Sequence, residues 1–193
     1  MVIKSYSKIN LSLKVNSKSR NGLHEIQSLY CLISLCDKIK INKIRKNKDS
    51  ISFKGPFAKL VKNKNNSVYK ILKKLRELDY ISNYYSITIT KNIPVFGGLG
   101  GGTSNAAYIL KYFLKNKINN SILNIFESLA GTDLKLFFIK QGFLKNLRSI
   151  IELKKQKFYF VLIQPKITCS TKKIYSMVKK TSKKRPFNKK FIK

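Results

Sequence analysis

A glycine-rich stretch in the middle of the chain reads PVFGGLGGGTSNAA, from Pro94 to Ala107. Five of the nine glycines in the sequence fall within six residues of it. Glycine lets backbone amides approach a ligand closely, and a helix that begins after such a loop adds free N–H groups and the positive end of its dipole. The stretch therefore predicts a phosphate-binding loop between a strand and a helix.

Two common phosphate-binding motifs do not fit this loop. No lysine precedes Thr103, as a Walker A loop requires, and the spaced glycines and downstream acid of a dinucleotide site are absent. A flexible linker is the alternative. That alternative is the weaker one, because a strand pattern and Pro94 precede the loop and an alanine-rich helical pattern follows it.

Periodicity around the loop predicts three helices. Ser67 is placed to cap a helix with apolar residues at Val68, Ile71, Leu72, Leu75 and Leu78. Thr103 or Ser104 is expected to open a second helix, and residues 122–129 form a third, shorter one.

Strand patterns occur both before and after these helices. Near the N-terminus Ile9, Leu11, Leu13 and Val15 alternate with Lys8, Asn10 and Ser12, and a turn follows at Asn21-Gly22. Further strands are expected at residues 29–35, 39–44, 51–53, 84–90, 136–139, 143–147 and 158–164, with a buried helical turn as the alternative at 136–139. Because strands and helices do not alternate regularly, the pattern favours an α+β fold over a doubly wound sheet.

Composition limits the class of protein. The chain has 193 residues, 43% of them hydrophobic, which is enough for a folded core and suits one domain or one domain with part of a second. No apolar run approaches the ~20 residues of a membrane span, and the N-terminus lacks the apolar segment of a secretory signal. We therefore expect a cytoplasmic protein without a membrane partner.

The charge is strongly positive: 41 lysines and arginines against 8 acids give +33. Lysines spread along the whole chain among asparagines indicate compositional drift, whereas a polyanion surface is the alternative, and only residues 179–193 concentrate charge. Cys31, Cys36 and Cys169 follow no metal or redox spacing, and a single histidine excludes multi-histidine zinc sites.

The glycine stretch resembles the ATP-binding motif of the GHMP kinase superfamily, and its triple glycine resembles most the 4-diphosphocytidyl-2-C-methyl-D-erythritol kinases of the non-mevalonate isoprenoid pathway. Three other segments are similar to motifs of that family: SKINLSL at residues 7–13, NGLHEIQSL at 21–29 and AGTD at 130–133. The four motifs stand in the family's order. The resemblance implies a GHMP-kinase N-terminal domain, the ribosomal protein S5 domain 2-like fold.

The implied reaction is phosphorylation of the 2-hydroxyl of a cytidine-diphosphate substrate from ATP with Mg²⁺. By the match, Asp133 accepts the hydroxyl proton, Lys8 lies beside it, and Asn10 orients substrate from the same strand face as Lys8. Without the resemblance these residues are typical of a helix-capping acid, a surface lysine and a polar strand residue.

Further roles follow from the resemblance alone. His24 is expected to hydrogen-bond cytosine, with Tyr175 as one face of a base clamp and Thr171 in the neighbouring substrate segment. Thr103 is expected to serve phosphate or Mg²⁺. The expected nucleotide-binding residues are Pro94, Gly97, Gly98, Leu99, Gly100, Gly101, Gly102, Thr103, Ser104 and Asn66.

The chain departs from the family pattern at several places. Leu23 replaces a stacking tyrosine, Phe96 replaces glycine, Lys135 replaces proline, and residues 146–152 replace a glycine-containing segment. We expect an N-terminal ATP-binding domain over residues 1–155 and only the start of a C-terminal domain over 156–193. An inactive truncated homologue, or a basic RNA-associated protein, is the alternative to an active kinase.

Overall fold

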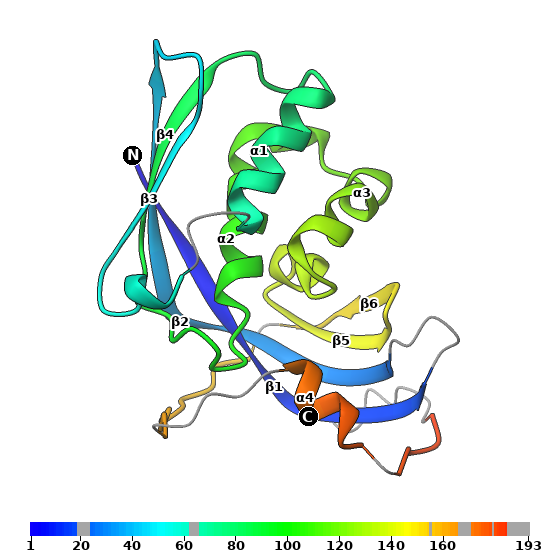
Figure 1. Cartoon of the computed structure of the whole chain (residues 1–193). Helices are drawn as coiled ribbons and strands as arrows, with labels where there is room; N and C mark the ends of the chain where they lie inside the picture. The colour runs from blue at the N-terminus through cyan, green and yellow to red at the C-terminus, as the bar shows by residue number, and fades with distance from the viewer. Residues whose placement is uncertain (19–23, 62–65, 155, 166–170, 179, 185–193) are drawn as a thin grey trace.

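The computed structural model describes residues 1–18, 24–61, 66–154, 156–165, 171–178 and 180–184. One twisted sheet lies against a layer of helices, which confirms the predicted α+β class (Figure 1). The strands are β1 (Val2–Lys18), β2 (His24–Ile44), β3 (Ser50–Lys54), β4 (Tyr84–Thr90), β5 (Gln141–Asn146) and β6 (Ser149–Glu152). The α-helices are α1 (Ser67–Glu77), α2 (Gly101–Leu114), α3 (Asn120–Ala130) and α4 (Thr171–Ser176), with 3₁₀ turns η1 (Ala58–Leu60), η2 (Lys115–Lys117) and η3 (Leu134–Phe138).

The long strand β2 organises the sheet. It pairs antiparallel with β1, while β4 pairs with its residues 38–44 and β5 with its residues 28–31. β3 adds to β4 in parallel, and β6 adds to β5. The two halves of β2 were expected as separate strands over 29–35 and 39–44. They form one strand because a bulge near Ser34 absorbs the break in the pattern.

The core lies between the sheet and helices α1, α2 and α3. Val68, Ile71, Leu72 and Leu75 of α1 are at most 2% exposed, as their helical spacing predicts. They pack with buried residues of β2, β4, α2 and α3, among them Ile39, Ile87, Ile89, Leu110 and Phe126. This face of the sheet therefore carries the helices.

Helix boundaries differ from the sequence expectation at both caps of interest. Asn66, not Ser67, caps α1, because its side-chain oxygen accepts the N–H of Tyr69 at 3.0 Å. Helix α2 starts at Gly101 rather than at Thr103 or Ser104, since Gly100 is its N-cap in the left-handed conformation. The last two glycines of the triplet thus belong to the first helical turn.

Two strand predictions are wrong. Residues 136–139 fall in and beside η3, so the helical-turn alternative is correct there. Residues 158–164 form no strand, because no described strand pairs with them. Their exposure does alternate as in a strand: every second side chain is less exposed than its neighbours, with Phe158, Phe160 and Leu162 at 40–47%. The short strand β6 and helix α4 were not anticipated.

The polar pattern of β1 is also corrected. Leu13, on the apolar face of the predicted alternation, is 41% exposed, whereas Lys8, on its polar face, is only 5% exposed. Register shifts between β1 and β2 after Tyr6, Asn10 and Val15 interrupt the simple alternation of buried and exposed residues. Cys31 is buried and Cys36 half-buried, while Cys169 and the Asn21-Gly22 turn lie outside the described residues. Among the described helices, each is too short or too polar to cross a bilayer.

Candidate active site

The glycine loop leads from β4 to the N-terminus of α2. Gly98 and Gly100 both have left-handed φ angles, 71° and 70°, and Ser104 N–H makes the first helical bond, to the Gly100 carbonyl at 2.8 Å. The N–H groups of Gly101, Gly102 and Thr103 precede that bond and have no partner within the helix. Gly97, Gly98 and Gly102 are exposed. The loop therefore presents accessible N–H donors at a positive helix end, which suits phosphate.

Neighbouring elements hold the loop close to β1 and η3. The Lys8 N–H donates to the Leu99 carbonyl at 3.1 Å. A Cβ added at Gly100 would lie 2.7 Å from Cζ of Phe137, and one at Gly101 would lie 3.0 Å from Cγ2 of Ile93. At Gly98, by contrast, an added Cβ would meet nothing within 4 Å.

Alanine at Gly100 should destabilise the protein more than alanine at Gly98. Both positions require a left-handed φ, which costs an L-residue about 1–2 kcal/mol. Only the Gly100 substitution also overpacks against Phe137, for a total of about 2–4 kcal/mol. Urea unfolding of the two variants measures this, with Gly98→Ala as the matched control; equal losses would show that Phe137 moves aside without cost.

Lys8 and Asp133, 125 positions apart in the sequence, meet beside the end of this loop. The Lys8 Nζ atom lies 3.1 Å from Oδ2 of Asp133, with the two side chains 6% and 33% exposed. Asp133 is the N-cap of η3, which follows α3, and Lys8 lies on β1 opposite Leu32, next to the bulge of β2 near Ser34. The structure thus brings together the two residues that the sequence led us to expect as neighbours.

Asn10 and Tyr30 complete the surroundings of this pair. Lys8 Nζ also donates to Oδ1 of Asn10 at 3.2 Å, which confirms that both side chains share a face. Burial, followed by the charges of Glu152 and Asp133, raises the pKa of Tyr30, whose hydroxyl has no hydrogen-bond partner among the described residues. Sequence reasoning missed Tyr30, since a tyrosine in an apolar strand carries no distinguishing signal.

His24 and Tyr175 are brought together from opposite ends of the chain. Their rings stack with centroids 5.3 Å apart and an interplanar angle of 21°. Burial, followed by the charge of Asp133, raises the pKa of Tyr175. Thr171 is the first residue of α4, and Leu23 lies outside the described residues.

The remaining predicted nucleotide residues surround the start of α2. The Thr103 hydroxyl donates to the Ala130 carbonyl at 2.8 Å, whereas the Ser104 hydroxyl faces β1 and donates to the Tyr6 carbonyl at 2.6 Å. Asn66 lies at the start of α1. The next residue, Ser67, connects this helix to α2, because its hydroxyl donates to the Gly102 carbonyl at 3.2 Å. Pro94 packs under Gly97, where an added Cβ would lie 3.3 Å from the proline ring.

The structure shows the surroundings of the residues that depart from the family pattern. Phe96 has a φ of 63°, a conformation that favours glycine, and its ring is 55% exposed. Lys135 forms an ion pair with Glu127 of α3, with 3.2 Å between Nζ and Oε2. Residues 146–152 form the turn and the second strand of the β5–β6 hairpin, in which Leu144 pairs with Ile150.

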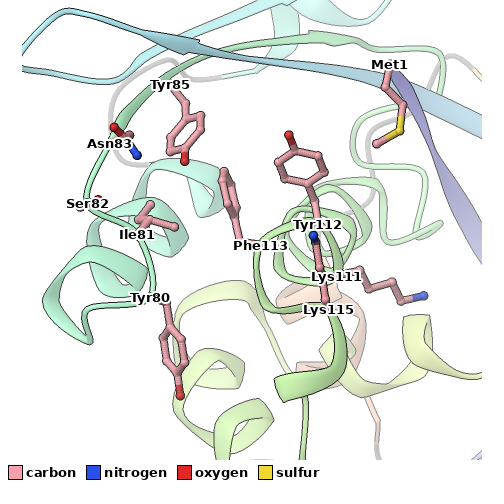
Figure 2. A pocket seen from close by; sticks show the side chains of 10 residues that line it. All are labelled: Met1, Tyr80, Ile81, Ser82, Asn83, Tyr85, Lys111, Tyr112, Phe113 and Lys115. Carbon is pink, nitrogen blue, oxygen red and sulfur yellow. The ribbon is translucent and has the colours of Figure 1, made fainter.

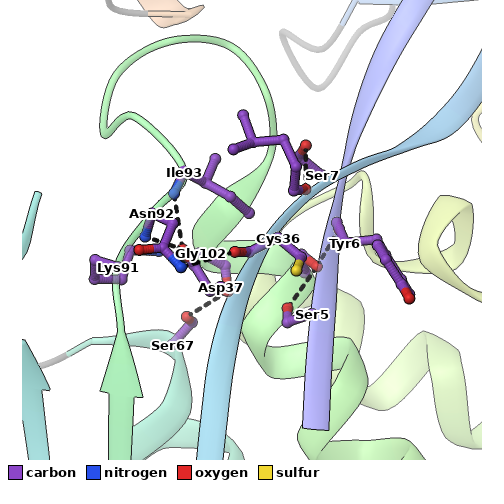
Figure 3. Close-up of polar contacts among 12 residues, drawn as sticks. Ser5, Tyr6, Ser7, Cys36, Asp37, Ser67, Lys91, Asn92, Ile93 and Gly102 are labelled. Atoms are coloured by element: carbon purple, nitrogen blue, oxygen red, sulfur yellow. Dashed lines mark hydrogen bonds and ion pairs between the residues drawn. The ribbon is translucent and has the colours of Figure 1, made fainter. Parts of the chain in front are cut away.

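A buried ion pair lies beneath the loop and was not anticipated. Lys91 Nζ bonds to Oδ2 of Asp37, and the two side chains are 4% and 0% exposed. The other Asp37 oxygen accepts the N–H groups of Asn92 and Ile93 at 2.8 and 2.9 Å (Figure 3). Lys91 Nζ is also 3.4 Å from the position of a Cβ on Gly101. This network fixes the chain where it leaves β4 for the glycine loop.

A hollow of about 630 Å³ lies at the other end of α2, away from this site. Figure 2 shows its aromatic lining, with Tyr80, Tyr85, Tyr112 and Phe113 around it. Lys111 also lines it, donates to the Phe137 carbonyl at 2.7 Å and lies 4.4 Å from the Tyr108 ring centre. Burial, helped by the charge of Lys140, lowers the pKa of Lys111 to about 8.

This pKa predicts a pH dependence of stability. Between pH 8 and about 10.4 the unfolded chain keeps the Lys111 proton that the folded chain has lost, so stability rises with pH. Between pH 7.5 and 10 the free energy of unfolding of the wild type should rise by about 1–2 kcal/mol relative to that of Lys111→Met. This value is discounted because the Lys111 side chain is partly exposed to solvent. Urea unfolding at several pH values measures this; a constant difference would contradict the lowered pKa.

Comparison with known proteins agrees with this geometry. Residues 66–131, from the cap of α1 to the end of α3, match the family described as GHMP kinases N terminal domain. The 4-diphosphocytidyl-2-C-methyl-D-erythritol kinase of Pelagibacter ubique is 35% identical over 192 residues, which cover 94% of this chain and 66% of that protein. The kinase of the same name from Persephonella marina is 34% identical over 187 residues, covering 92% and 65%.

The fold is shared with a solved relative. The crystal structure of 4-(cytidine 5'-diphospho)-2C-methyl-D-erythritol kinase superposes with a TM-score of 0.61 at 23% identity, covering 79% of this chain and 55% of that one. The chain spans about 65% of the length of the Pelagibacter and Persephonella kinases. Sequence match, fold and glycine loop agree, and the chain belongs to the GHMP kinase family.

Proposed function

We propose that this chain carries the ATP-binding and proton-accepting part of a kinase that phosphorylates the 2-hydroxyl of 4-diphosphocytidyl-2-C-methyl-D-erythritol in isoprenoid precursor synthesis. The relatives of that name support the substrate. The single observation that carries the chemistry is the Lys8–Asp133 pair, 3.1 Å apart beside the glycine loop. A cytoplasmic location, where ATP is available, is part of the proposal.

The residues at the loop fit the phosphate groups of a nucleoside triphosphate. Exposed glycines, N–H groups at the start of α2 and the buried amine of Lys8 provide donors and positive charge for phosphate oxygens. The Asn105 Oδ1 atom is buried and without a hydrogen-bond partner among the described residues. When bound, Mg²⁺ would neutralise phosphate charge, held by phosphate oxygens with Thr103 and Asn105 as candidate oxygen ligands.

In the proposed step, Asp133 accepts the proton of the substrate 2-hydroxyl. That oxygen forms a bond to the γ-phosphorus while the bond from this phosphorus to the bridging oxygen of ATP breaks, and ADP leaves. Lys8 holds Asp133 in place and offers positive charge where oxygen charge develops. Asn10, within 3.2 Å of the same amine, orients the hydroxyl group with its amide.

The substrate end of the site is proposed at His24 and Tyr175. A histidine offers the hydrogen bond and a tyrosine the ring that a cytosine base needs. Their stacking in this structure supports a shared role, although it also means that one ring must move for a base to enter between them. Thr171, at the start of the same helix as Tyr175, is included by the resemblance.

The test is ADP release in the presence of ATP, Mg²⁺ and the cytidine-diphosphate substrate. We expect turnover with this substrate and none with the same polyol phosphate lacking the cytidine group. Nucleotide binding without any turnover would support the inactive homologue instead. Release of ADP at the same rate with both acceptors would overturn the assigned substrate.

A further inference from the structure

The sheet has a second face that the helices leave uncovered. Helices α1, α2 and α3 all lie on one side of strands β1, β2, β4 and β3, and the opposite side is open (Figure 1). Exposed lysines gather on this open side; we call it the lysine face, made up of Lys4, Lys38, Lys40 and Lys54 with Asn42, Ser50, Ser52, Ser86, Thr88 and Thr90.

Strand register places these side chains in rows. Lys4 is opposite Lys38, Lys38 opposite Thr90, and Thr90 opposite Lys54. Paired residues of neighbouring strands project to the same side, about 4.5–5.5 Å apart at Cβ. The next row joins Lys40, Thr88 and Ser52, and the Ser52 and Thr88 hydroxyls lie 3.1 Å apart, which confirms their common side.

The intervening residues fix which side faces the core. Ile39 and Ile89 alternate with the lysine rows and are fully buried, and Ile3 and Phe53 pack against the same core. The lysines therefore project away from the helices. The kinase site lies on the helix side, where α2 carries the glycine loop, so the lysine face is separate from it.

Positive charge on this face has no internal compensation. Six of the eight acids of the chain form ion pairs, with Lys8, Lys73, Lys74, Arg76, Lys91, Lys135 and Lys184 as their partners. Within the described ranges, no ion pair involves a lysine of the face. Like charges directly opposite on neighbouring strands repel, so Lys4 beside Lys38 costs stability unless an anion binds between them.

We propose that the lysine face binds the phosphate backbone of RNA without regard to sequence. Lysine ammonium and serine or threonine hydroxyl groups are the donors that contact phosphate and sugar oxygens. None of the residues that define the face is aromatic, and the ring of Tyr84, next in the same alternation on β4, is covered by the Arg76 guanidinium at 4.4 Å, so backbone contacts dominate. A membrane surface fits less well, because insertion needs several large apolar side chains and the two lysine rows carry only Val2, opposite Lys40.

The test compares two fourfold variants in binding a fluorescent 20-nucleotide poly(U) RNA. The first changes Lys4, Lys38, Lys40 and Lys54 to Gln. The second changes Lys117, Lys145, Lys154 and Lys157, which are exposed and off the face, in the same way. Both variants lower the net charge equally, so a difference between them reports position and not total charge.

Four phosphate contacts correspond to a roughly 50-fold loss of affinity between 50 and 200 mM salt. We expect the face variant to lose at least about tenfold in affinity at 100 mM salt and its salt slope to fall by about 3, while the control changes little. Thermal unfolding shows whether each variant is folded. Equal losses in both variants, or equal competition by polyglutamate or by phosphatidylserine vesicles, would overturn the proposal.

Discussion

Replacing Asp133 with asparagine is expected to lower kcat for the proposed kinase reaction by a factor of about 10²–10⁴, the usual contribution of a positioned proton acceptor. Asparagine keeps the size and one oxygen of the side chain but cannot accept the hydroxyl proton. The change leaves Lys8 buried at 5% exposure without its counter-charge, so folding must be checked by circular dichroism. Rates of ADP release at saturating ATP and substrate measure the effect.

Asp79→Asn provides the matched control. Asp79 is an exposed acid beyond the C-terminus of α1, and its φ of 57° suits asparagine as well as aspartate. Its kcat should stay within a factor of two of the wild type. Activity that survives in Asp133→Asn would remove Asp133 from the role of base, whereas loss in both variants would point to general damage.

Local sequence signals predicted the scaffold of the site well. Helical spacing of apolar residues identified α1, and alternation identified β4, because both patterns depend only on residues a few positions apart. The glycine cluster between these two patterns identified the loop before α2. The resemblance to a known family then paired Lys8 with Asp133, which no periodicity connects. The catalytic roles themselves stay predictions.

Other features depend on contacts that sequence order hides. The three register shifts between β1 and β2 affect which side chains are buried, and Lys8 lies next to the first of them, yet an extra residue in a strand leaves no mark in composition. Residues 158–164 show the reverse case: the alternation is typical of a strand, but a strand needs a partner, and no described segment supplies one. Pairing is a property of the whole fold.

The Asp37–Lys91 pair, 54 positions apart, leads to the prediction with the largest effect on stability. Lys91→Met leaves the Asp37 carboxylate fully buried without a counter-charge, and removing one partner of a buried pair costs about 3–5 kcal/mol. The loss should appear in the free energy of unfolding by urea. For comparison, Lys74→Met breaks an exposed pair with Glu77 and should cost at most about 0.5 kcal/mol.

A double variant separates charge from hydrogen bonding in this network. Asp37→Asn combined with Lys91→Met removes both charges but keeps an oxygen to accept the N–H groups of Asn92 and Ile93. Its cost should therefore be about 2 kcal/mol lower than that of Lys91→Met alone, because no buried charge is left unpaired. If the double variant is instead less stable than Lys91→Met, the carboxylate tolerates burial through its two backbone donors, and the lysine acts mainly by packing beside Gly101.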